Sequence, residues 1–387
     1  MSRRQQPGLF DFGLDQAQEE RARRLHEESI IIDMCFHGPV GAAVYSEQML
    51  KQVTAEYERH RDPRKLATFV EELPVRMAAQ GQLPAFREWW DISGVTAGTR
   101  EVDMRSLPDA TPTLAHLTLQ FDSFDWLIKA LSVEDIQRAK TEGKHAGIIA
   151  AQDSVAIGQN LHNLNLFHDF GLRVLQLTYN SMNFAGAGCT ERTDAGLSTF
   201  GVQLIERMND LGVVVDTGHS GRQTTLDAAG VSRDPVIASH TCAEGVFAHR
   251  RCKSDEELLA IGKSGGVIGI VTMPTFLSAA PEVTMEHFLD HVDYVAKLVG
   301  TEHVGVGTDW PMSWPEWVAR LMAEEWAPQV GFAPEDRVPS TEMVEGFSDF
   351  REFLNITLGL VSRGYSDAEV QSILALNWLR VLERVWK

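Results

Sequence analysis

A cysteine and a histidine, Cys35 and His37, stand two residues apart where a largely apolar stretch, residues 30–33, runs toward a Gly-Pro pair. In a β-strand, side chains two residues apart point to the same side, so these two side chains can reach one point in space. A thiolate and an imidazole at that point could bind a transition metal, or act as a nucleophile with its base. A third interpretation stays open, in which the pair only ends a strand.

Polar side chains also follow other apolar stretches of the chain. His219 comes shortly after "VVVD", His240 directly after "VIAS", and Asp309 ends "VGVGTD". Gln152 and Tyr179 follow two further stretches in the same way. One histidine at a strand end is usually structural, but several imidazoles together with a thiolate and a carboxylate suit a transition metal such as Zn²⁺. The repeated pattern therefore predicts a metal site where several strands end.

The apolar stretches have the composition of strands buried on both faces of a parallel sheet, because most of them show no alternation of polar and apolar residues. The predicted strands cover residues 29–33, 92–98, 145–151, 172–178, 212–216, 235–239, 267–271 and 303–309. Helical patterns lie between them. Eight strands with intervening helices predict an α/β fold of the (β/α)₈ TIM-barrel type, and an open doubly wound sheet is the alternative.

Two segments interrupt this alternation. Residues 38–91 form a helical insertion after the first strand, and residues 310–345 follow the eighth strand and are rich in Trp and Pro. Both leave the carboxyl ends of strands, where the active sites of barrels form. We therefore expect residues 1–387 to form one domain, with the first segment as a lid and the second as a pocket wall. Surface decoration is the alternative interpretation of both segments.

Four tryptophans follow Asp309 closely, namely Trp310, Trp314, Trp317 and Trp326. Large aromatic side chains here could form a wall for an aromatic or flat apolar substrate, and simple packing beneath a loop explains them equally well. Trp310, which is adjacent to Asp309, is the candidate for contact with the substrate.

The chain has 387 residues and a formal net charge of −19. This charge argues against nucleic acid or an anionic membrane as a partner and permits cations. The start, "MSRRQQPGLFDFG", lacks the apolar core of a signal peptide, and no apolar stretch is long enough to span a bilayer. We expect a cytoplasmic protein with free thiols that acts on a small molecule, and a homodimer is left open.

Five stretches of the sequence resemble the membrane (renal) dipeptidase family, which is peptidase family M19 of the amidohydrolase superfamily. They are "LRVLQLTYNSMN", "GLSTFGVQLIERMNDLGVVVDTGHSG", "PVIASHTCAEGVFAHRRCKSDEELLAIGKSGGVIGIV", "HVGVGTDW" and "RGYSDAEVQSILALNWLRVLERV". The similarity runs from about Glu19 to the C-terminus, apart from the insertion and the Trp-rich segment. Its most specific feature is the pair of histidine motifs with an arginine shortly after the second.

The resemblance implies a barrel with a binuclear zinc site that hydrolyses dipeptides. His219 and His240 match the family's ligands of the second metal, and Asp309 matches the residue that handles protons. Arg251 matches the arginine that holds the carboxylate of the substrate. Tyr179 stands where the family has a histidine that contacts the substrate, which makes it a candidate for the same role.

The remaining metal ligands of the family are altered here. The family has His-x-Asp after the first strand, where this chain has Cys35 and His37, and a bridging Glu after the third, where this chain has Gln152. The adjacent Asp153 could replace that Glu only through a β-bulge. Two divalent ions about 4 Å apart repel by roughly 16 kcal/mol, and the substitutions remove two of the negative charges that offset this repulsion. We therefore expect one divalent transition metal ion per chain, with Zn²⁺ as the first choice.

The expected ligands of this ion are His219 and His240, together with groups from the altered motifs. His37 ranks before Cys35, which is either a thiolate ligand or a neighbour of an empty first-metal position. Gln152 can coordinate through its amide oxygen.

The function expected from these residues and the resemblance is that of a metal-dependent hydrolase. It would cleave an amide or related C–N bond in a small substrate that bears a carboxylate and has an aromatic portion. Ordinary dipeptides are not expected to be good substrates, because the binuclear site is not intact. The alternatives are a mononuclear decarboxylase or C–C bond hydrolase that acts on an aromatic acid, and a catalytically inactive homologue that binds a ligand.

Overall fold

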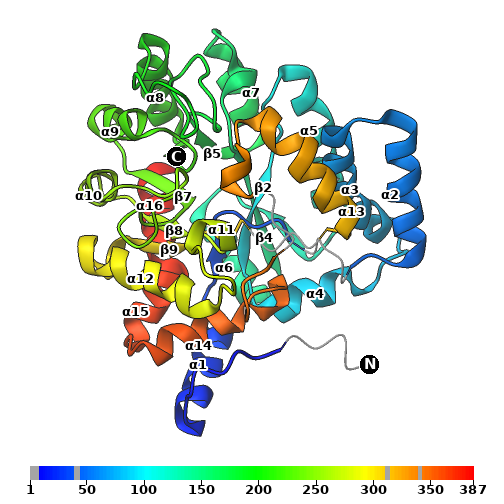
Figure 1. Cartoon of the computed structure of the whole chain (residues 1–387), viewed down its shortest axis with the longest axis vertical. Coiled ribbons are helices and arrows are strands. Elements are labelled where there is room, and N and C mark those ends of the chain that lie inside the picture. The colour runs from blue at the N-terminus through cyan, green and yellow to red at the C-terminus, as the bar shows by residue number, and fades with distance from the viewer. Residues whose placement is uncertain (1–7, 39–43, 310–313, 339–341) are drawn as a thin grey trace.

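The computed structural model describes residues 8–38, 44–309, 314–338 and 342–387. Parallel strands form a barrel at the centre of these residues, and helices surround it (Figure 1). The barrel strands are β1 (Ile32–Asp33), β2 (Ala97–Glu101), β4 (His145–Ala151), β5 (Leu172–Gln176), β6 (Val214–Asp216), β7 (Val236–Thr241), β8 (Ile268–Ile270) and β9 (Val304–Val306). A further short strand, β3 (Leu127–Lys129), pairs with the start of β4.

Backbone hydrogen bonds close the barrel between its first and last strands. The Met34 N–H donates to the Val306 carbonyl at 3.2 Å, and the Asp309 N–H donates to the Cys35 carbonyl at 2.9 Å. The fold is therefore the predicted (β/α)₈ barrel, and the open doubly wound sheet is wrong. The second of these bonds also joins two of the predicted site residues at the mouth.

The barrel strands are buried on both faces, as their apolar composition predicts. All residues of β4, for example, are buried. The surrounding helices are α5 (Leu107–Ser123), α6 (Val133–Glu142), α7 (His162–Phe170), α8 (Thr199–Leu211), α9 (Arg222–Val231), α10 (Asp255–Lys263), α11 (Pro274–Leu277) and α12 (Met285–Val299). The terminal helices are α1 (Gln16–Glu28), α14 (Leu354–Ser362), α15 (Asp367–Gln371) and α16 (Asn377–Val385). Ser366 caps α15, as predicted, because its side chain accepts a hydrogen bond from the Glu369 N–H.

Two segments cover one side of the barrel mouth. The insertion after β1 contains α2 (Glu47–His60), α3 (Pro63–Ala79) and α4 (Ala85–Ser93), and the segment after β9 contains α13 (Glu316–Leu321). Helix α3 packs against α5 and against the π-helical turn Met322–Trp326, which continues α13. Figure 1 shows α2, α3, α5 and α13 together at one side of the molecule. Both predicted segments therefore approach the mouth from the same direction.

The second strand begins later than the sequence indicates. The prediction placed it at residues 92–98, whereas β2 spans Ala97–Glu101. The first residues of the predicted strand end α4, and the chain then turns at Gly94, which has a φ of 72°. A positive φ favours glycine, so this residue stops the helix and sets the start of the strand. The shift moves the end of the strand to Glu101, a residue that the sequence analysis did not single out.

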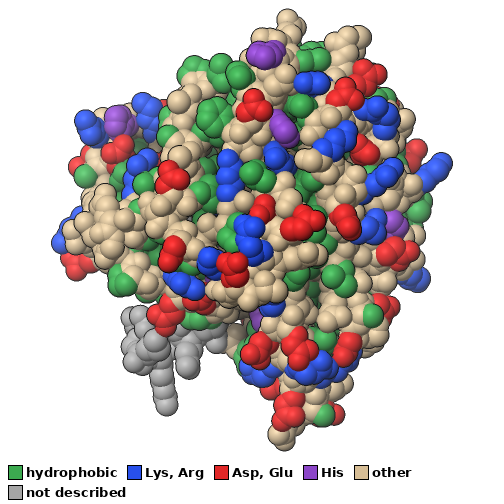
Figure 2. All heavy atoms as spheres, turned by 180° about the vertical axis from the view of Figure 1, so that it is seen from behind, with side chains coloured by type: hydrophobic (Ala, Val, Ile, Leu, Met, Phe, Trp, Pro, Cys, Tyr) green, Lys and Arg blue, Asp and Glu red, His purple; other side chains and the backbone are tan. Residues whose placement is uncertain are grey.

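The surface carries mixed charges on the face opposite to Figure 1. Figure 2 shows acidic and basic side chains interspersed over that face. Near the chain termini, Arg21 and Arg24 of α1 form ion pairs with Asp367. Among the described residues, no helix is both long and apolar enough to cross a membrane.

The fold contains a buried histidine whose protonation must oppose folding. His291 of α12 accepts a hydrogen bond from the Ala243 N–H at 3.0 Å, and its other ring nitrogen lies 3.1 Å from the Leu277 carbonyl. Burial lowers the pKa of His291 to about 4, so the folded protein binds this proton less readily than the unfolded chain does. The stabilisation is therefore present above the unfolded pKa of about 6.5 and is lost as the pH falls toward 4.

We expect His291→Asn to remove part of the acid sensitivity of folding. Between pH 7.5 and pH 5, the wild-type protein should lose about 2 kcal/mol more unfolding free energy than the variant, because a shift of one pKa unit corresponds to about 1.4 kcal/mol. Urea unfolding at the two pH values measures this difference. Equal pH dependence in both proteins would contradict the assignment.

Candidate metal centre

The chain turns sharply after β1, and the buried Asp33 carboxylate holds this turn. Its Oδ1 accepts hydrogen bonds from the backbone N–H groups of Cys35, at 3.0 Å, and Thr308, at 2.8 Å. Phe36 packs on Gly98 of β2, where a Cβ atom would lie only 2.5 Å from the aromatic ring. With Phe36 directed to the neighbouring strand, Cys35 faces the barrel mouth.

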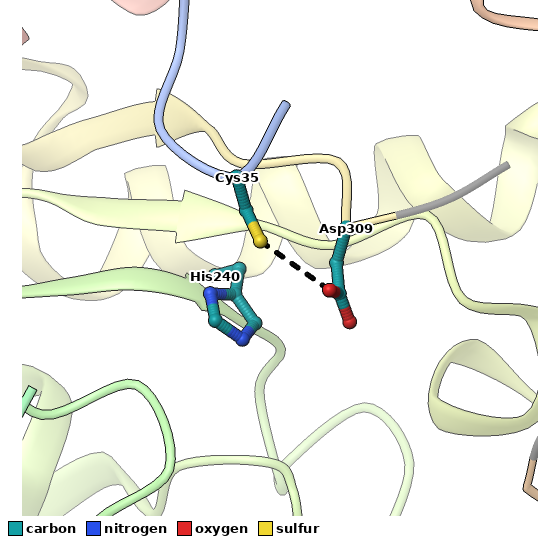
Figure 3. Close-up of side chains that lie close together, drawn as sticks. All are labelled: Cys35, His240 and Asp309. Carbon is teal, nitrogen blue, oxygen red and sulfur yellow. Dashed lines mark hydrogen bonds between the residues drawn. The ribbon is translucent and has the colours of Figure 1, made fainter. Parts of the chain in front are cut away.

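Three side chains from distant parts of the sequence meet at this mouth. Ligand atoms of Cys35, His240 and Asp309 all lie within 4.8 Å of one another. The Cys35 thiol donates to Asp309 Oδ1 at 3.3 Å (Figure 3). Burial and the Asp309 charge raise the pKa of the Cys35 thiol, so the thiolate requires a compensating cation nearby. A thiolate, an imidazole and a carboxylate are the ligand types that Zn²⁺ prefers, and the cluster therefore fits a metal ion.

His219 adds a second imidazole directly beside this cluster. The Nε2 atoms of His219 and His240 are 2.9 Å apart. The Nδ1 atom of His219 lies 2.6 Å from Asn180 Oδ1, and that of His240 lies 2.9 Å from Ser239 Oγ. Because an amide oxygen only accepts hydrogen bonds, Asn180 requires the proton of His219 to be on Nδ1. The Nε2 atom of His219 is thus left with a lone pair that can bind a cation.

Both of these imidazoles are neutral at physiological pH. Burial lowers the pKa of His240 to about 3, and burial together with the nearby Arg251 charge lowers the pKa of His219 well below its usual value. Tyr179 stacks on the His219 ring with a centroid separation of 4.0 Å. Neutral, oriented imidazoles are the form that binds metals, so the surroundings prepare both residues for this role.

His37 lies at the edge of the cluster and pairs with Asp309. Its Nε2 atom is 3.4 Å from Asp309 Oδ1. Burial alone would lower the pKa of His37, but the hydrogen bond to Asp309 and the charge of Glu71 outweigh it and raise this pKa to about 9. The structure thus includes Cys35 in the group of ligand atoms that lie within 4.8 Å of one another. His37 is outside that group and contacts it through Asp309. The ranking of His37 before Cys35 stays a prediction, and the geometry favours the opposite order.

Asp309 is held in an unusual backbone conformation. Its φ is 55°, in the left-handed region that residues other than glycine seldom adopt. Burial would raise the pKa of its carboxyl group, but His240 and His37 outweigh this effect and hold the pKa below its usual range. Asp309 is therefore an anion at neutral pH. Strained residues of this kind concentrate at functional sites, where the surrounding structure fixes them.

Gln152 and Asp153, which follow β4, point to different neighbours. The Gln152 amide nitrogen lies 3.4 Å from Cys35 Sγ, so Gln152 touches the cluster. The Asp153 carboxylate instead accepts hydrogen bonds from Asn183 Nδ2 and the Ser154 N–H, both at 2.7 Å. Asp153 therefore does not take the position of the missing bridging carboxylate.

Arg251 is buried behind the two histidines. One guanidinium nitrogen donates to the Gly218 carbonyl and another lies 3.5 Å from the His240 carbonyl. The buried Nε atom has no hydrogen-bond partner among the described residues. A guanidinium has five N–H donors, so Arg251 retains donors for a carboxylate.

We expect Arg251→Lys to weaken the binding of substrates that carry a carboxylate. A charge-assisted hydrogen bond contributes about 1.5–3 kcal/mol, which corresponds to a rise in KM of roughly 10- to 100-fold. Steady-state kinetics with a carboxylate substrate and its primary amide measure the effect. An equal rise for both substrates would show that Arg251 supports the structure only.

One cavity connects the site residues. It has a volume of about 480 Å³, within the range of small-molecule sites, and His37, Gln152, Tyr179, His219, Arg251 and Asp309 line it. Trp314 and Trp326 also line it, whereas Trp317 is 37% exposed and contacts Tyr57 instead. Trp310 lies outside the described residues. Of the three tryptophans that the structure describes here, Trp314 and Trp326 thus face the space that a substrate would occupy.

Acidic residues that the sequence pattern did not single out also line this cavity, among them Glu101 and Glu71. Glu101 ends β2, and Glu71 lies on α3. Burial raises the pKa of Glu101 to about 7, although the charge of His37 opposes the shift, and burial also raises the pKa of Glu71. A polar residue at the end of a strand would have pointed to Glu101. The second strand was predicted at residues 92–98, however, and so ended before Glu101. No sequence signal distinguished Glu71 from other acidic residues on helices.

A (β/α)₈ barrel with imidazole, thiolate and carboxylate groups at the ends of its strands is typical of metal-dependent hydrolases. The comparison with known proteins gives the family itself. Residues 118–322 match the model of the membrane dipeptidase family, Peptidase family M19, which covers more than half of the chain. The chain belongs to this family.

Two curated relatives support the assignment. Dipeptidase tcpJ from Claviceps purpurea is 28% identical over 264 residues, which cover 67% of this chain and 56% of that protein. An uncharacterized dipeptidase from Schizosaccharomyces pombe is 31% identical over 228 residues, which cover 58% of this chain and 48% of that protein. The chain spans about half the length of these relatives.

A solved structure resembles nearly the whole chain. The amidohydrolase from Pseudomonas aeruginosa has 26% sequence identity and a TM-score of 0.72, with 94% of this chain and 99% of that chain covered. The similarity therefore extends beyond the matched family region to the full barrel.

Proposed function

We propose that this protein is a metal-dependent hydrolase that cleaves an amide or related C–N bond in a small molecule with a carboxylate. The observation that carries the proposal is the meeting of Cys35, His240 and Asp309 within 4.8 Å of one another, with His219 beside them. Membership of the membrane dipeptidase family supports the same class of reaction.

The contacts of each residue suggest its role in the proposed reaction. Cys35, His219 and His240 would hold a divalent ion, with His37 and Gln152 beside it. When bound, such an ion would supply Lewis-acid chemistry, by polarising the scissile carbonyl group and lowering the pKa of a water molecule. Asp309 takes up the proton of the attacking water and passes it to the leaving nitrogen. Arg251 binds the substrate carboxylate by paired hydrogen bonds, and Tyr179 lies between these groups as a further contact.

We propose one ion per chain, with Zn²⁺ as the first choice. The described cluster offers a single carboxylate, Asp309, and the amide of Gln152 stands where a bridging carboxylate would be needed. Asp153 is engaged with Asn183 and does not supply one. With the bridge missing, repulsion between two divalent ions would be poorly offset.

The two segments at the mouth enclose the substrate in this account. Residues of α3 form one side of the cavity and would act as a lid, and Trp314 and Trp326 form another and would act as a pocket wall. We propose that these tryptophans contact a flat apolar part of the substrate. Stacking and burial against aromatic rings would favour such a group over a polar one.

Separate substitutions at the start of the site test the ligand assignment. We expect Cys35→Ser to lose most of the bound metal, because the serine hydroxyl is a poor ligand for Zn²⁺, and His37→Ala to lose less. Metal analysis of the two purified variants measures this order. Alkylation gives an independent readout, because a metal-bound thiolate resists the reagent until the metal is stripped. Full metal content in Cys35→Ser would contradict the assignment.

The function is tested with protein that has been purified without chelator. We expect about one transition metal ion per chain and release of amine from N-acyl amino acids that keep a free carboxylate. Release of CO₂ from aromatic acids without amide cleavage would favour a decarboxylase instead. Protein that binds no metal, and gains no thermal stability from Zn²⁺, Mn²⁺ or Fe²⁺, would favour an inactive homologue, since a bound ligand stabilises the folded state.

A further inference from the structure

The cavity continues well beyond the metal cluster. Its far end lies between α3, α5 and the carboxyl end of β2, and is lined by Glu71, Glu101, His116, Leu117 and Gln120. The proposed chemistry uses none of these side chains. The proposed reaction therefore does not require the space and the polar groups at this far end.

The far end lies across the barrel from the proposed carboxylate site. In the strand order β1-β2-β4-β5-β6-β7-β8-β9, three strands separate β2 from β7 in either direction, so these two strands are opposite each other. Glu101 ends β2, whereas His240 lies in β7 and Arg251 follows it. A substrate whose carboxylate binds Arg251 must therefore extend past the metal toward β2. The group that reaches the far end is its acyl portion.

Unpartnered polar atoms gather along this cavity. Among the described residues, ten have a buried side-chain nitrogen or oxygen atom without a hydrogen-bond partner, and six of the ten line the cavity. At the far end, Gln120 is only 1% exposed and both its amide oxygen and its amide nitrogen lack partners. His116 is 8% exposed and its Nδ1 atom lacks a partner. Buried polar groups are nearly always paired in folded proteins, so these atoms need a partner from outside the chain, which is either water or a ligand.

From this arrangement we propose that the far end is a specificity subsite for an acyl group that ends in a carboxamide. Gln120 would accept a hydrogen bond from the carboxamide N–H and donate one to its oxygen, and His116 would add a third hydrogen bond. This subsite rests on the proposed function in one respect, which is that the acyl portion of the substrate reaches this end when the carboxylate binds Arg251. Gln120 and His116 act on binding and not on the bond that is broken.

The surroundings favour a neutral group over a charged one. Acidic groups (Glu71, Glu101) and a basic group (Arg100) line the same end together, so no large excess of one sign is present to select a charged group. Burial and the Arg100 charge lower the pKa of His116 to about 3, so its ring is neutral and offers one donor and one acceptor. A carboxamide, which also donates and accepts, matches both side chains.

The test uses three families of N-acyl-L-alanines with one, two or three methylene groups between the acyl carbonyl and the end group. The end group is a carboxamide, the isosteric isopropyl group or a carboxylate. At the best chain length, we expect kcat/KM for the carboxamide to exceed that of the other two by about 100-fold, because a site built for hydrogen bonds rejects analogues that leave its groups unpaired.

A matched pair of variants separates recognition from folding. Gln120→Met keeps nearly the same shape and removes both unpartnered atoms, so we expect the preference for the carboxamide to vanish while the melting temperature stays the same or rises. Gln137→Met, on the exposed face of α6, is the control and should keep the preference. A carboxamide preference that survives Gln120→Met would overturn the proposal.

Binding to the metal-loaded protein distinguishes this inference from the proposed function. If none of the compounds is hydrolysed but calorimetry still finds tighter binding of the carboxamide, the subsite stands and the reaction is wrong. If all three families are hydrolysed and bound equally well, the reaction stands and the subsite is overturned.

Discussion

We expect His240→Ala to lose its divalent ion and with it nearly all hydrolytic activity. His240 is fully buried, belongs to the group of three ligand atoms and touches Nε2 of His219. Loss of a residue that only supports a metal ligand lowers affinity by 10- to 100-fold, so loss of the ligand itself should lower it by more than about 100-fold. Competition with a chromophoric chelator measures the affinity, and the activity assay follows the same samples.

His162→Ala is the matched control, because His162 is exposed at the start of α7 and does not line the cavity. The control should retain both metal and activity. Circular dichroism confirms that each variant is folded. A folded His240→Ala protein with wild-type metal affinity would remove His240 from the centre.

Asp309→Asn should slow the reaction without emptying the centre. The amide keeps the shape of the side chain but cannot take up a proton, and loss of a general base or acid typically lowers kcat by about 10²- to 10⁴-fold. Cys35, His219 and His240 remain to hold the ion. The pKa of His37, which Asp309 helps to raise to about 9, should fall in the variant and can be followed by NMR.

Asp153→Asn serves as the comparison, because Asp153 also lines the cavity but is engaged with Asn183 and the Ser154 N–H. We expect this variant to keep its metal and a kcat within about tenfold of the wild type. An Asp309→Asn protein with wild-type kcat, or an Asp153→Asn protein with the larger loss, would reverse the roles given to the two carboxylates.

The barrel could be predicted from the sequence because its strands are buried on both faces. Apolar stretches such as residues 146–151 and 235–238 have few alternatives to a central strand, and helical periodicity is clear between them. The second strand was misplaced because apolar residues at 92 and 95 continued the strand pattern backward into α4. The helix ends where the chain turns at Gly94, which has a φ of 72°, and the strand begins at Ala97.

The convergence of the site could be predicted in the same way. Cys35, His219, His240 and Asp309 each follow a recognisable strand, and the carboxyl ends of parallel strands share one mouth. The sequence did not reveal the relative distances that place Cys35 in the closest group and His37 beyond it. That order depends on the turn that Asp33 and Phe36 impose after β1.

The far end of the cavity could not be predicted, because helices build it. Glu71, His116 and Gln120 lie on α3 and α5, where polar residues are ordinary and most face solvent. Helix α3 packs against α5, and Gln120 of α5 is buried with its amide unpartnered. Sequence patterns report which face of a helix is apolar, but they do not report which polar residue is enclosed by a neighbouring segment.

The central claim is that one metal ion lies among Cys35, His219 and His240. Anomalous scattering from crystals of zinc-loaded protein, recorded on both sides of the zinc absorption edge, tests it most directly. We expect a single peak that contacts the side chains of Cys35, His219 and His240. Two fully occupied peaks about 4 Å apart, or a peak that has no contact with these three side chains, would contradict it.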